Sequence, residues 1–167
     1  MGYIRIKEIK VYAYCLFCET QRCKTIADYI STNYGYICLP PQIIQRKWVK
    51  GVPMEIKHDW LPGYLFLYLD KPRQIRIDIS GIIRYLGEGY LDGQDRIFAE
   101  MIFETKGVMG PVSLIQENGR YVIHDPVWKK LNGQITRVDR ERKRCCISYE
   151  FDSMFRTIWV GYIMISH

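Results

Sequence analysis

The pattern of apolar and polar positions at the start of the chain predicts a strand followed by a helix. Residues 11–18 (VYAYCLFC) carry no charge and are rich in aromatic side chains, which is typical of a buried strand. A helix is expected to begin at Glu19 and Thr20, and Gly35 is positioned to cap its C-terminus. The apolar residues of this helix have the i, i+3, i+4, i+7 spacing of one buried face: Cys23, Ile26, Ala27 and Ile30.

The next segment returns to strands around a charged excursion. Residues 36–44 predict a strand, which two consecutive prolines place at a sheet edge or a bulge. Residues 45–57 are charged and interrupted by glycine and proline, so we expect an exposed hairpin or loop. A sharp turn at residues 60–63 leads into residues 64–69 (YLFLYL), which form the strongest strand pattern in the chain.

Two further strand patterns and a helix follow. In residues 73–80 the isoleucines alternate with charged residues, and this period of two predicts a strand. Residues 82–86 predict another short strand that ends at a glycine-rich turn. Asp92 or Asp95 is suited to cap a second helix. That helix is expected to bury Ile97, Phe98, Met101 and Ile102.

The character of the chain changes after the second helix. Residues 105–118 contain glycine and proline and lack helical periodicity, so we place a domain boundary there. Short strands with regular turn signals then predict a small β-barrel, with strands at 120–124, 134–138, 144–151, 155–160 and 162–165. About 50 residues is small for an independent hydrophobic core, so we expect this part to be marginally stable alone.

The composition is that of an ordinary globular protein with a moderate positive charge. Hydrophobic residues make up 48% and charged residues 25% of the 167 residues, which excludes disordered and collagen-like chains. No apolar run approaches the roughly 20 residues of a membrane helix, and residues 1–10 lack the apolar core of a signal peptide. We therefore expect a cytoplasmic protein. The net charge of +6 permits a nucleic-acid partner without requiring one.

The cysteines and polar residues do not form a catalytic or metal-binding motif. Six cysteines without a secretion signal are expected to be reduced. Cys15 and Cys18 form a CxxC, but no second pair of cysteines or histidines has zinc-site spacing, so we predict neither metal nor another cofactor. Paired carboxylates, Ser/His/Asp or Cys/His arrangements and a phosphate-binding loop are also missing from the sequence, so we expect no enzymatic activity.

Three stretches, in their order and spacing, resemble the NusG family of transcription elongation factors. They are YCLFCET at residues 14–20, LPGYLFLYLD at 61–70, and a segment at 121–151 that contains VIHDPVWKKLNGQITRVDRERKRCCISYEF. The first two resemble the family's N-terminal domain and the third resembles its KOW domain. Within the family, LFCET, the GVMG linker and the DRERKR hairpin tip look most like the specialised LoaP-type antiterminators.

The resemblance implies an α+β fold in two domains. Residues 1–106 match the N-terminal domain, an antiparallel sheet with helices against it, and residues 119–167 match the KOW β-barrel, with 107–118 as a linker. In the family, the stretch that matches residues 73–80 is a helix. We therefore expect a helix there in place of the strand that the alternation predicts.

The resemblance also implies a factor that binds the clamp helices of RNA polymerase and suppresses pausing. The docking site is an apolar depression rich in aromatic residues, a composition that interface centres favour. The positions that match it are Tyr14, Phe17, Leu61, Pro62, Gly63, Tyr64 and Phe66. Strand geometry places Tyr64 and Phe66 on one face. Each aromatic residue of this set is either an interface residue or part of the core.

Two basic clusters are candidate nucleic-acid sites. The first surrounds the barrel turns and suits phosphate backbones, and a leader RNA hairpin is the partner that the resemblance implies: Lys129, Lys130, Arg137, Arg140, Arg142, Lys143 and Arg144. The second lies in the charged excursion, which the resemblance places near upstream DNA: Arg46, Lys47 and Lys50. Trp48 in this excursion is suited to stack on an unpaired base. Both clusters are alternatively solvated loops.

Two residues of the KOW-like segment have an expected structural role. KOW motifs carry a glycine at the position of Gly133, and we interpret it as a turn residue that needs a positive φ. Trp128 either packs in the barrel or makes an exposed contact.

Two alternatives to the antiterminator remain open. One is a housekeeping factor of the same family, whose KOW domain binds a ribosomal protein or Rho. The other is a KOW RNA-binding protein without polymerase contact, in which the aromatic strand is plain core. None of these hypotheses includes a membrane partner.

Overall fold

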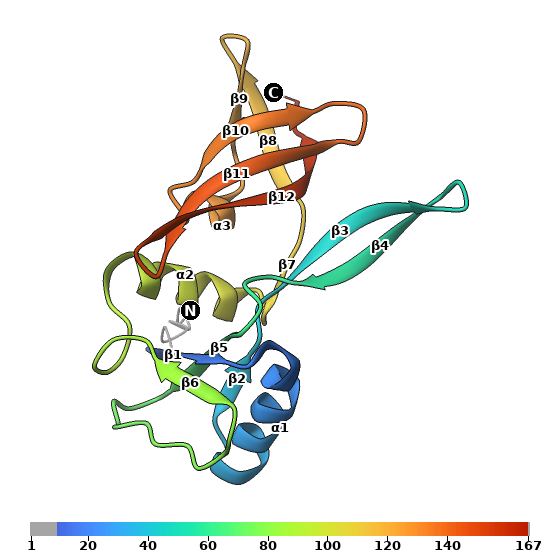
Figure 1. The fold of residues 1–167 in the computed structure, drawn as a ribbon. Coiled ribbons are helices and arrows are strands. Elements are labelled where there is room, and N and C mark those ends of the chain that lie inside the picture. Colours follow the sequence, from blue (N-terminus) through green and yellow to red (C-terminus); the bar gives the residue numbers. More distant parts are fainter. Residues whose placement is uncertain (1–9, 167) are drawn as a thin grey trace, which may run out of the picture.

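A four-stranded antiparallel sheet forms the first part of the fold. The computed structural model describes residues 10–166, and Figure 1 shows this sheet at the bottom of the molecule. Its strand order is β2-β5-β1-β6. The strands are β1 (Tyr12–Cys18), β2 (Ile37–Leu39), β5 (Tyr64–Leu69) and β6 (Ile82–Tyr85). All six side chains of β5 are buried although they alternate in direction, because both faces of the sheet are covered.

Helix α1 (Cys23–Tyr34) covers one face of this sheet and follows a 3-10 turn at Thr20–Arg22. It ends where Gly35 adopts a left-handed φ of 69° and its N–H donates to the Ser31 carbonyl at 3.2 Å. This is the αL C-cap that glycine forms without strain. The buried residues of α1 are Ile26, Ala27 and Ile30.

Helix α2 (Gly93–Glu104) covers the opposite face and lies between the four-stranded sheet and a second, five-stranded sheet (Figure 1). Its N-cap is Asp92, whose carboxylate accepts a hydrogen bond from the Gly93 N–H at 2.8 Å. Phe98, Ala99, Met101 and Ile102 of this helix are completely buried. α2 therefore belongs to the packing of both sheets.

The five-stranded sheet has the strand order β10-β11-β12-β8-β9. Only the β12–β8 pair is parallel, and β9 approaches β10, so that the sheet curls toward a barrel. A short helix, α3 (Pro126–Lys129), joins β9 to β10. The strands are β8 (Val112–Glu117), β9 (Arg120–Ile123), β10 (Gln134–Asp139), β11 (Arg144–Phe151) and β12 (Met154–Met164).

A long hairpin projects beside the five-stranded sheet (Figure 1). It consists of β3 (Gln42–Val49) and β4 (Val52–Asp59), and β7 (Val108–Met109) pairs with the base of β3 in parallel. Ile43 at its base is buried, whereas the tip is exposed. The hairpin thus reaches from the four-stranded sheet to the height of β12.

Two apolar clusters hold these layers together. The smaller one lies between α1 and the four-stranded sheet. The larger one is continuous from the other face of that sheet through α2 into the five-stranded sheet. The part expected to be marginally stable alone therefore shares its core with the rest of the molecule.

Most of the expected elements are confirmed. The strands predicted at 11–18, 64–69 and 82–86 are β1, β5 and β6, and the excursion at 45–57 is the β3–β4 hairpin. Both helices are present, with Gly35 and Asp92 as their caps. Among residues 10–166, no helix is both long and apolar enough to span a membrane. Residues 1–9, most of the stretch judged unlike a signal peptide, lie outside the described residues.

The helix expected at residues 73–80 is wrong, and so is the strand. Within residues 10–166, this segment belongs to no helix and pairs with no strand. Its backbone N–H groups instead donate to tyrosine hydroxyls: Arg73 to Tyr14 at 2.8 Å, Ile77 to Tyr85 at 3.2 Å and Asp78 to Tyr34 at 3.2 Å. Side chains thus satisfy donors that a strand partner or a helix normally satisfies. Ile75, Ile77 and Ile79 pack on the cluster under α1, which explains the alternation.

Four further expectations need correction. The segment 107–118, expected to be a linker, contains β7 and β8 and is hydrogen-bonded into two sheets. The strands expected at 155–160 and 162–165 form one strand, β12, because Gly161 continues the extended backbone. Ile97 is 39% exposed. Helix α3 was not expected.

Candidate functional site

The aromatic residues of β5 lie on a single face of the four-stranded sheet. Tyr64, Phe66 and Tyr68 belong to the larger cluster, whereas the intervening leucines face α1. The predicted sharing of one face by Tyr64 and Phe66 is therefore confirmed. Phe151, at the end of β11, packs on both rings, with centroid distances of 5.2 Å to Tyr64 and 5.6 Å to Phe66. The five-stranded sheet thus covers this aromatic face.

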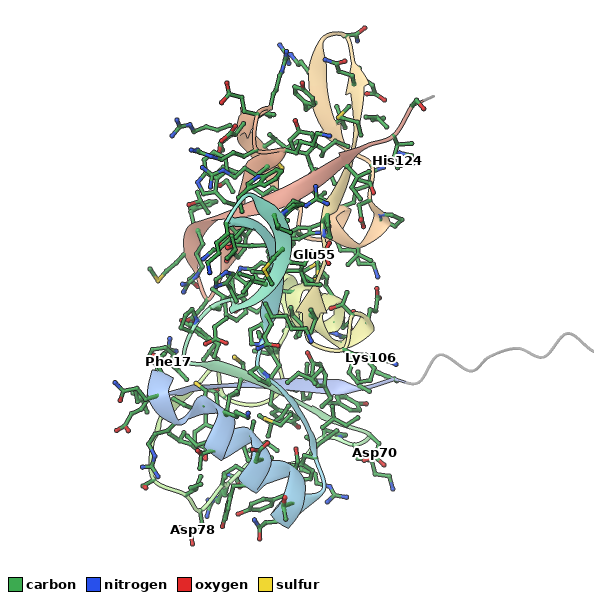
Figure 2. The ribbon with its side chains drawn as sticks, turned by 90° about the vertical axis from the view of Figure 1, so that its right-hand side faces the viewer. Phe17, Glu55, Asp70, Asp78, Lys106 and His124 are labelled. Atoms are coloured by element: carbon green, nitrogen blue, oxygen red, sulfur yellow. The ribbon has the colours of Figure 1, made fainter. Side chains whose placement is uncertain are left out.

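The structure brings together part of the predicted docking set. Phe17 is half-buried at the end of β1, where Figure 2 labels it, and its ring centroid lies 4.9 Å from that of Tyr64. Gly63 has a φ of 97°, and a Cβ there would lie 2.8 Å from the Phe17 ring, so only glycine fits. Leu61 is buried beside them and Pro62 is exposed.

Tyr14 does not belong to this group. It is 4% exposed and lies in the cluster under α1, on the opposite side of the sheet. Its hydroxyl accepts the Arg73 N–H, so it supports the extended segment that follows β5. The period of two along β1 separates it from Phe17, three residues away.

A polar cluster fixes the β11–β12 turn to the edge of the aromatic face. The carboxylate of Asp152 in this turn pairs with Arg84 of β6 and accepts a hydrogen bond from the Tyr64 hydroxyl at 2.9 Å. The Asp152 N–H donates to Asp95 of α2 at 2.9 Å, and Arg156 donates to the Tyr64 hydroxyl at 3.1 Å. Burial is the main cause that raises the pKa of Tyr64. Three elements of the first part of the fold therefore hold one turn of the second.

A second site lies between the hairpin and the five-stranded sheet. Some basic residues of each predicted nucleic-acid cluster meet there along a groove of about 500 Å³. Apolar residues of β12 form part of its lining. The charged residues along it are Arg46 and Glu55 from the hairpin and Arg140, Arg142 and Lys143 from the β10–β11 tip. One groove thus collects charges from segments almost a hundred residues apart in sequence.

Interactions around this groove fix its walls. The Gln45 side chain on β3 donates to the Trp159 carbonyl on β12 at 3.1 Å. The guanidinium of Arg144 lies 4.6 Å from the ring centroid of Trp159, and that of Arg140 lies 5.5 Å from Tyr121. These contacts orient the arginines by stacking on aromatic rings.

Asp139 is one of two acidic residues of the tip, and its bonds lie within the turn. It accepts the Arg142 backbone N–H at 3.1 Å and lies 3.3 Å from the Arg144 guanidinium. The backbone hydrogen bond from Arg142 is the main cause that lowers the pKa of Asp139. Within residues 10–166, Arg46, Arg140 and Lys143 have no carboxylate at ion-pair distance.

Other predicted basic residues lie outside the groove. Lys129 is the last residue of α3, and Lys130 follows it and forms an ion pair with Glu104. Lys47 is on the hairpin face opposite to Arg46, and Lys50 is in the hairpin turn with a φ of 51°. Arg137 lies against the Trp159 ring at 5.8 Å. The first predicted cluster is therefore divided between separate surfaces.

Comparison with solved structures finds a protein of similar architecture. A structure that reports domain interaction in Thermotoga maritima NusG covers 91% of this chain and 94% of its own, with a TM-score of 0.50 and 13% sequence identity. The chain has a NusG-like fold. No protein-family model and no curated protein matches the sequence. The resemblance inferred from three short stretches is thus confirmed at the level of the fold.

Within this NusG-like fold, Gly133 is required for a reason other than the one expected. Its φ is not positive; the left-handed residue of the turn is Asn132, with a φ of 53°. A Cβ on Gly133 would instead lie 2.7 Å from Ile147 and 3.1 Å from the Ser148 carbonyl on β11. The glycine is needed because two backbones approach closely.

Trp128 packs in the core and is 1% exposed. Its indole N–H donates to the Gly110 carbonyl at 3.3 Å, and its ring centroid lies 5.6 Å from that of Trp60. Trp60 in turn donates its N–H to the Tyr149 hydroxyl at 2.8 Å. The two tryptophans therefore link the first part of the fold to the five-stranded sheet.

Sequence reasoning missed the residues that cover the aromatic face. These are Arg84, Tyr149, Phe151, Asp152 and Arg156. The alternation in β11 marks Tyr149 and Phe151 as inward-facing, but it does not identify the surface that they meet.

The last features of the predicted chemistry are the possible metal ligands and the two cysteines of the CxxC. Among residues 10–166, no three His, Cys, Asp or Glu side chains gather in a way that would hold a metal ion. Cys15 and Cys18 lie on opposite faces of β1, in different clusters. Burial raises the pKa of both thiols, and that of Cys18 reaches about 12. Both thiols are therefore protonated at neutral pH.

Proposed function

We propose that this protein is a transcription elongation factor that binds RNA polymerase through the aromatic face of its four-stranded sheet and suppresses pausing or termination. The observation that carries the proposal is the NusG-like fold over 91% of the chain. The aromatic face supports it, because Phe17, Tyr64 and Phe66 form one contiguous apolar surface. Rigid aromatic residues of this kind form the centres of protein interfaces.

Within this function, the features shared with LoaP-type antiterminators and the basic groove favour a specialised factor that also contacts nucleic acid. Arg46, Arg140 and Lys143 have no carboxylate at ion-pair distance among residues 10–166, so they are suited to phosphate groups. The nascent RNA and upstream DNA are the nucleic acids within reach of such a factor.

Polymerase binding through this face requires that the β11–β12 turn leaves it. Phe151 covers the rings of Tyr64 and Phe66, and Asp152 is bound to Tyr64, Arg84 and Asp95. A partner that binds the uncovered face shifts the population toward the open arrangement by its differential affinity. Weakening the turn contacts is therefore expected to strengthen polymerase binding.

The test is capture of core RNA polymerase by the purified full chain and by three variants. Arg84→Glu replaces the attraction to Asp152 with repulsion, and we expect it to increase capture. Phe17→Ala removes the half-buried ring of the face, and we expect it to reduce capture. Phe155→Ala is the control, because this ring is 83% exposed at the β11–β12 turn and lies off the face.

Equal capture by Phe17→Ala and the wild-type protein would show that the docking face is wrong. Capture of no polymerase by any form, including Arg84→Glu, would overturn the proposed function.

The burial of Tyr64 and Phe66 favours a second candidate, a nucleic-acid-binding protein without polymerase contact. In that case both residues are only core, at 7% and 0% exposed. Copurification with ribosomes in place of polymerase is the outcome that favours this candidate.

A further inference from the structure

We infer that the β3–β4 hairpin and the β10–β11 tip together form one binding groove for a single-stranded nucleic acid. The inference rests on the nucleic-acid contact in the proposed function, and it adds which surfaces cooperate and which form of nucleic acid they take. It does not depend on polymerase binding.

The distribution of charge along the groove is the first support. Four basic side chains and the carboxylate of Glu55 line it, and Arg142 is paired with Asp139 at 3.5 Å, which leaves Arg46, Arg140 and Lys143 without an ion-pair partner among residues 10–166. Figure 2 shows the hairpin, with Glu55 labelled, passing in front of the five-stranded sheet, and the Gln45–Trp159 hydrogen bond joins the two. Charges from two walls around one cavity focus a positive potential in it. A polyanion is therefore the ligand class that the groove attracts.

The apolar part of the lining restricts which kinds of polyanion fit the groove. Ile44, Pro111, Tyr162 and Ile163 lie between the basic walls. A free phosphate or a polyphosphate has no apolar surface to place against these residues. A nucleic-acid strand has both parts, because phosphates alternate with sugars and bases that have apolar faces.

The register of the hairpin adds an aromatic residue to the same face. Arg46 is opposite Glu55, and Trp48 is opposite Pro53. Residues two apart on a strand share a face, so Trp48 continues the groove face beyond Arg46 toward the hairpin tip. Its side chain is 65% exposed. An exposed indole next to a basic groove is the stacking platform that proteins use for unpaired bases.

The same indole distinguishes a single strand from a duplex. Bases in a duplex are stacked on one another, and proteins recognise double-stranded RNA mainly by its shape and backbone. A single strand offers free base faces to Trp48 while its phosphates meet the arginines. We therefore expect the groove to favour single strands over duplexes of the same composition.

The experiment measures binding of the full chain to fluorescently labelled oligonucleotides by anisotropy. The probes are single-stranded RNA and single-stranded DNA of about 12 nucleotides, which is within the usual size of such sites, and an RNA duplex of equal length. Each probe is titrated at about 50 and 200 mM salt to obtain the salt dependence. We expect at least one single strand to bind more tightly than the duplex, and the stronger of the two identifies RNA or DNA as the ligand.

Three variants test the two walls and the platform. Arg46→Ala and Arg140→Ala are each expected to reduce the salt slope by about one, as loss of one phosphate contact does. Trp48→Ala is expected to weaken single-strand binding on the order of fivefold to a hundredfold, and to change duplex binding little. Thermal unfolding of each variant checks that the fold is retained.

Matched controls come from the same elements. Lys47→Ala removes one charge from the other face of the hairpin, next to Arg46, and Lys129→Ala removes one near α3. Neither is expected to change the salt slope by as much as Arg46→Ala. Equal binding of duplex and single strands, or equal effects of Lys47→Ala and Arg46→Ala, would overturn the inference. If the protein binds single strands as expected but captures no polymerase, the inference about the groove is supported and only the proposed polymerase binding is overturned.

Discussion

The two faces of the four-stranded sheet are built from different kinds of side chain. Under α1, the largest fully buried residues are aliphatic: Leu16, Ile26, Ile30, Leu65 and Leu67. The opposite face meets α2 and the five-stranded sheet mainly through aromatic residues: Trp60, Tyr64, Phe66, Phe98, Trp128, Tyr149 and Phe151. Tyrosine, tryptophan and phenylalanine are the residues enriched at interfaces between proteins. The centre of the α1 side is thus aliphatic, with Tyr14, Tyr29 and Tyr34 packed around it, whereas the centre of the α2 side is aromatic, as interfaces between proteins are.

The polar groups of the aromatic face point to the same distinction. The Trp60 N–H binds the Tyr149 hydroxyl, and the Tyr64 hydroxyl binds Asp152, so hydrogen bonds cross between the two sheets. Buried tyrosine and tryptophan need such partners, and water replaces them when the surfaces separate. Leucine and isoleucine have no comparable compensation in water. Separation of the two sheets therefore exposes polar groups that water can satisfy.

The largest expected effect is that of Phe98→Ala. Phe98 of α2 contacts both sheets, with ring centroids 5.7 Å from Phe66 and 4.7 Å from Phe151. Removing a buried phenylalanine ring costs about 3–5 kcal/mol of unfolding free energy. We expect urea unfolding followed by tryptophan fluorescence, to which the interface residues Trp60 and Trp128 contribute, to precede unfolding followed by circular dichroism.

Ile30→Ala is the matched control on the α1 side. It is expected to cost about 2–5 kcal/mol but to shift both transitions together, because its neighbours belong to one cluster. Coincident transitions in Phe98→Ala would contradict the difference between the two faces.

A smaller effect is expected from Tyr149→Phe, which removes one oxygen from the interface. The Trp60 N–H then loses its acceptor while the ring packing is retained. An unpaired buried donor costs about 1–3 kcal/mol. Chemical denaturation measures this loss. Tyr29→Phe on α1 is the control, and a loss as large as that of Tyr149→Phe would show that the crossing hydrogen bond is unimportant.

The smallest effect concerns alkaline pH. Burial is the main cause that raises the pKa of Tyr149 to about 12, compared with about 10 in an unfolded chain. The stability contributed by the neutral form is complete below pH 10 and decreases as the pH rises toward 12. At pH 10.5 the loss is below about 1 kcal/mol. We expect the difference in unfolding free energy between wild type and Tyr149→Phe to decrease over this pH range. An unchanged difference would show that burial does not raise the pKa of Tyr149.

The local elements of the fold were predictable from sequence, whereas their long-range partners were not. The uncharged run in β1, the helical spacing in α1 and the glycine at position 35 each act over a few residues. The segment 73–80 failed because tyrosine hydroxyls far away in sequence replace its strand partner. The supposed linker failed because β8 is stabilised by β12, some fifty residues later.

The candidate sites follow the same rule. Phe17, Gly63, Tyr64 and Phe66 lie together because a turn and two paired strands bring them together, which the sequence pattern indicates. The turn that covers them was not foreseen, because the contact of Asp152 with Arg84 depends on how two sheets pack. Likewise, nothing in either basic segment indicates that Arg46 and Arg140 line one groove.

The position of β12 in the five-stranded sheet has a consequence for the newly made chain. This last strand lies between β11 and β8, so the sheet is incomplete until Tyr162 can pair with Val112. At ordinary rates of protein synthesis, the residues between these two positions take roughly 3 to 10 seconds to add. The four-stranded sheet and α2 precede them in the chain. For those seconds the nascent protein carries the aromatic face with α2 packed on it but without the completed five-stranded sheet, and a partner present at the site of translation meets this less covered face first.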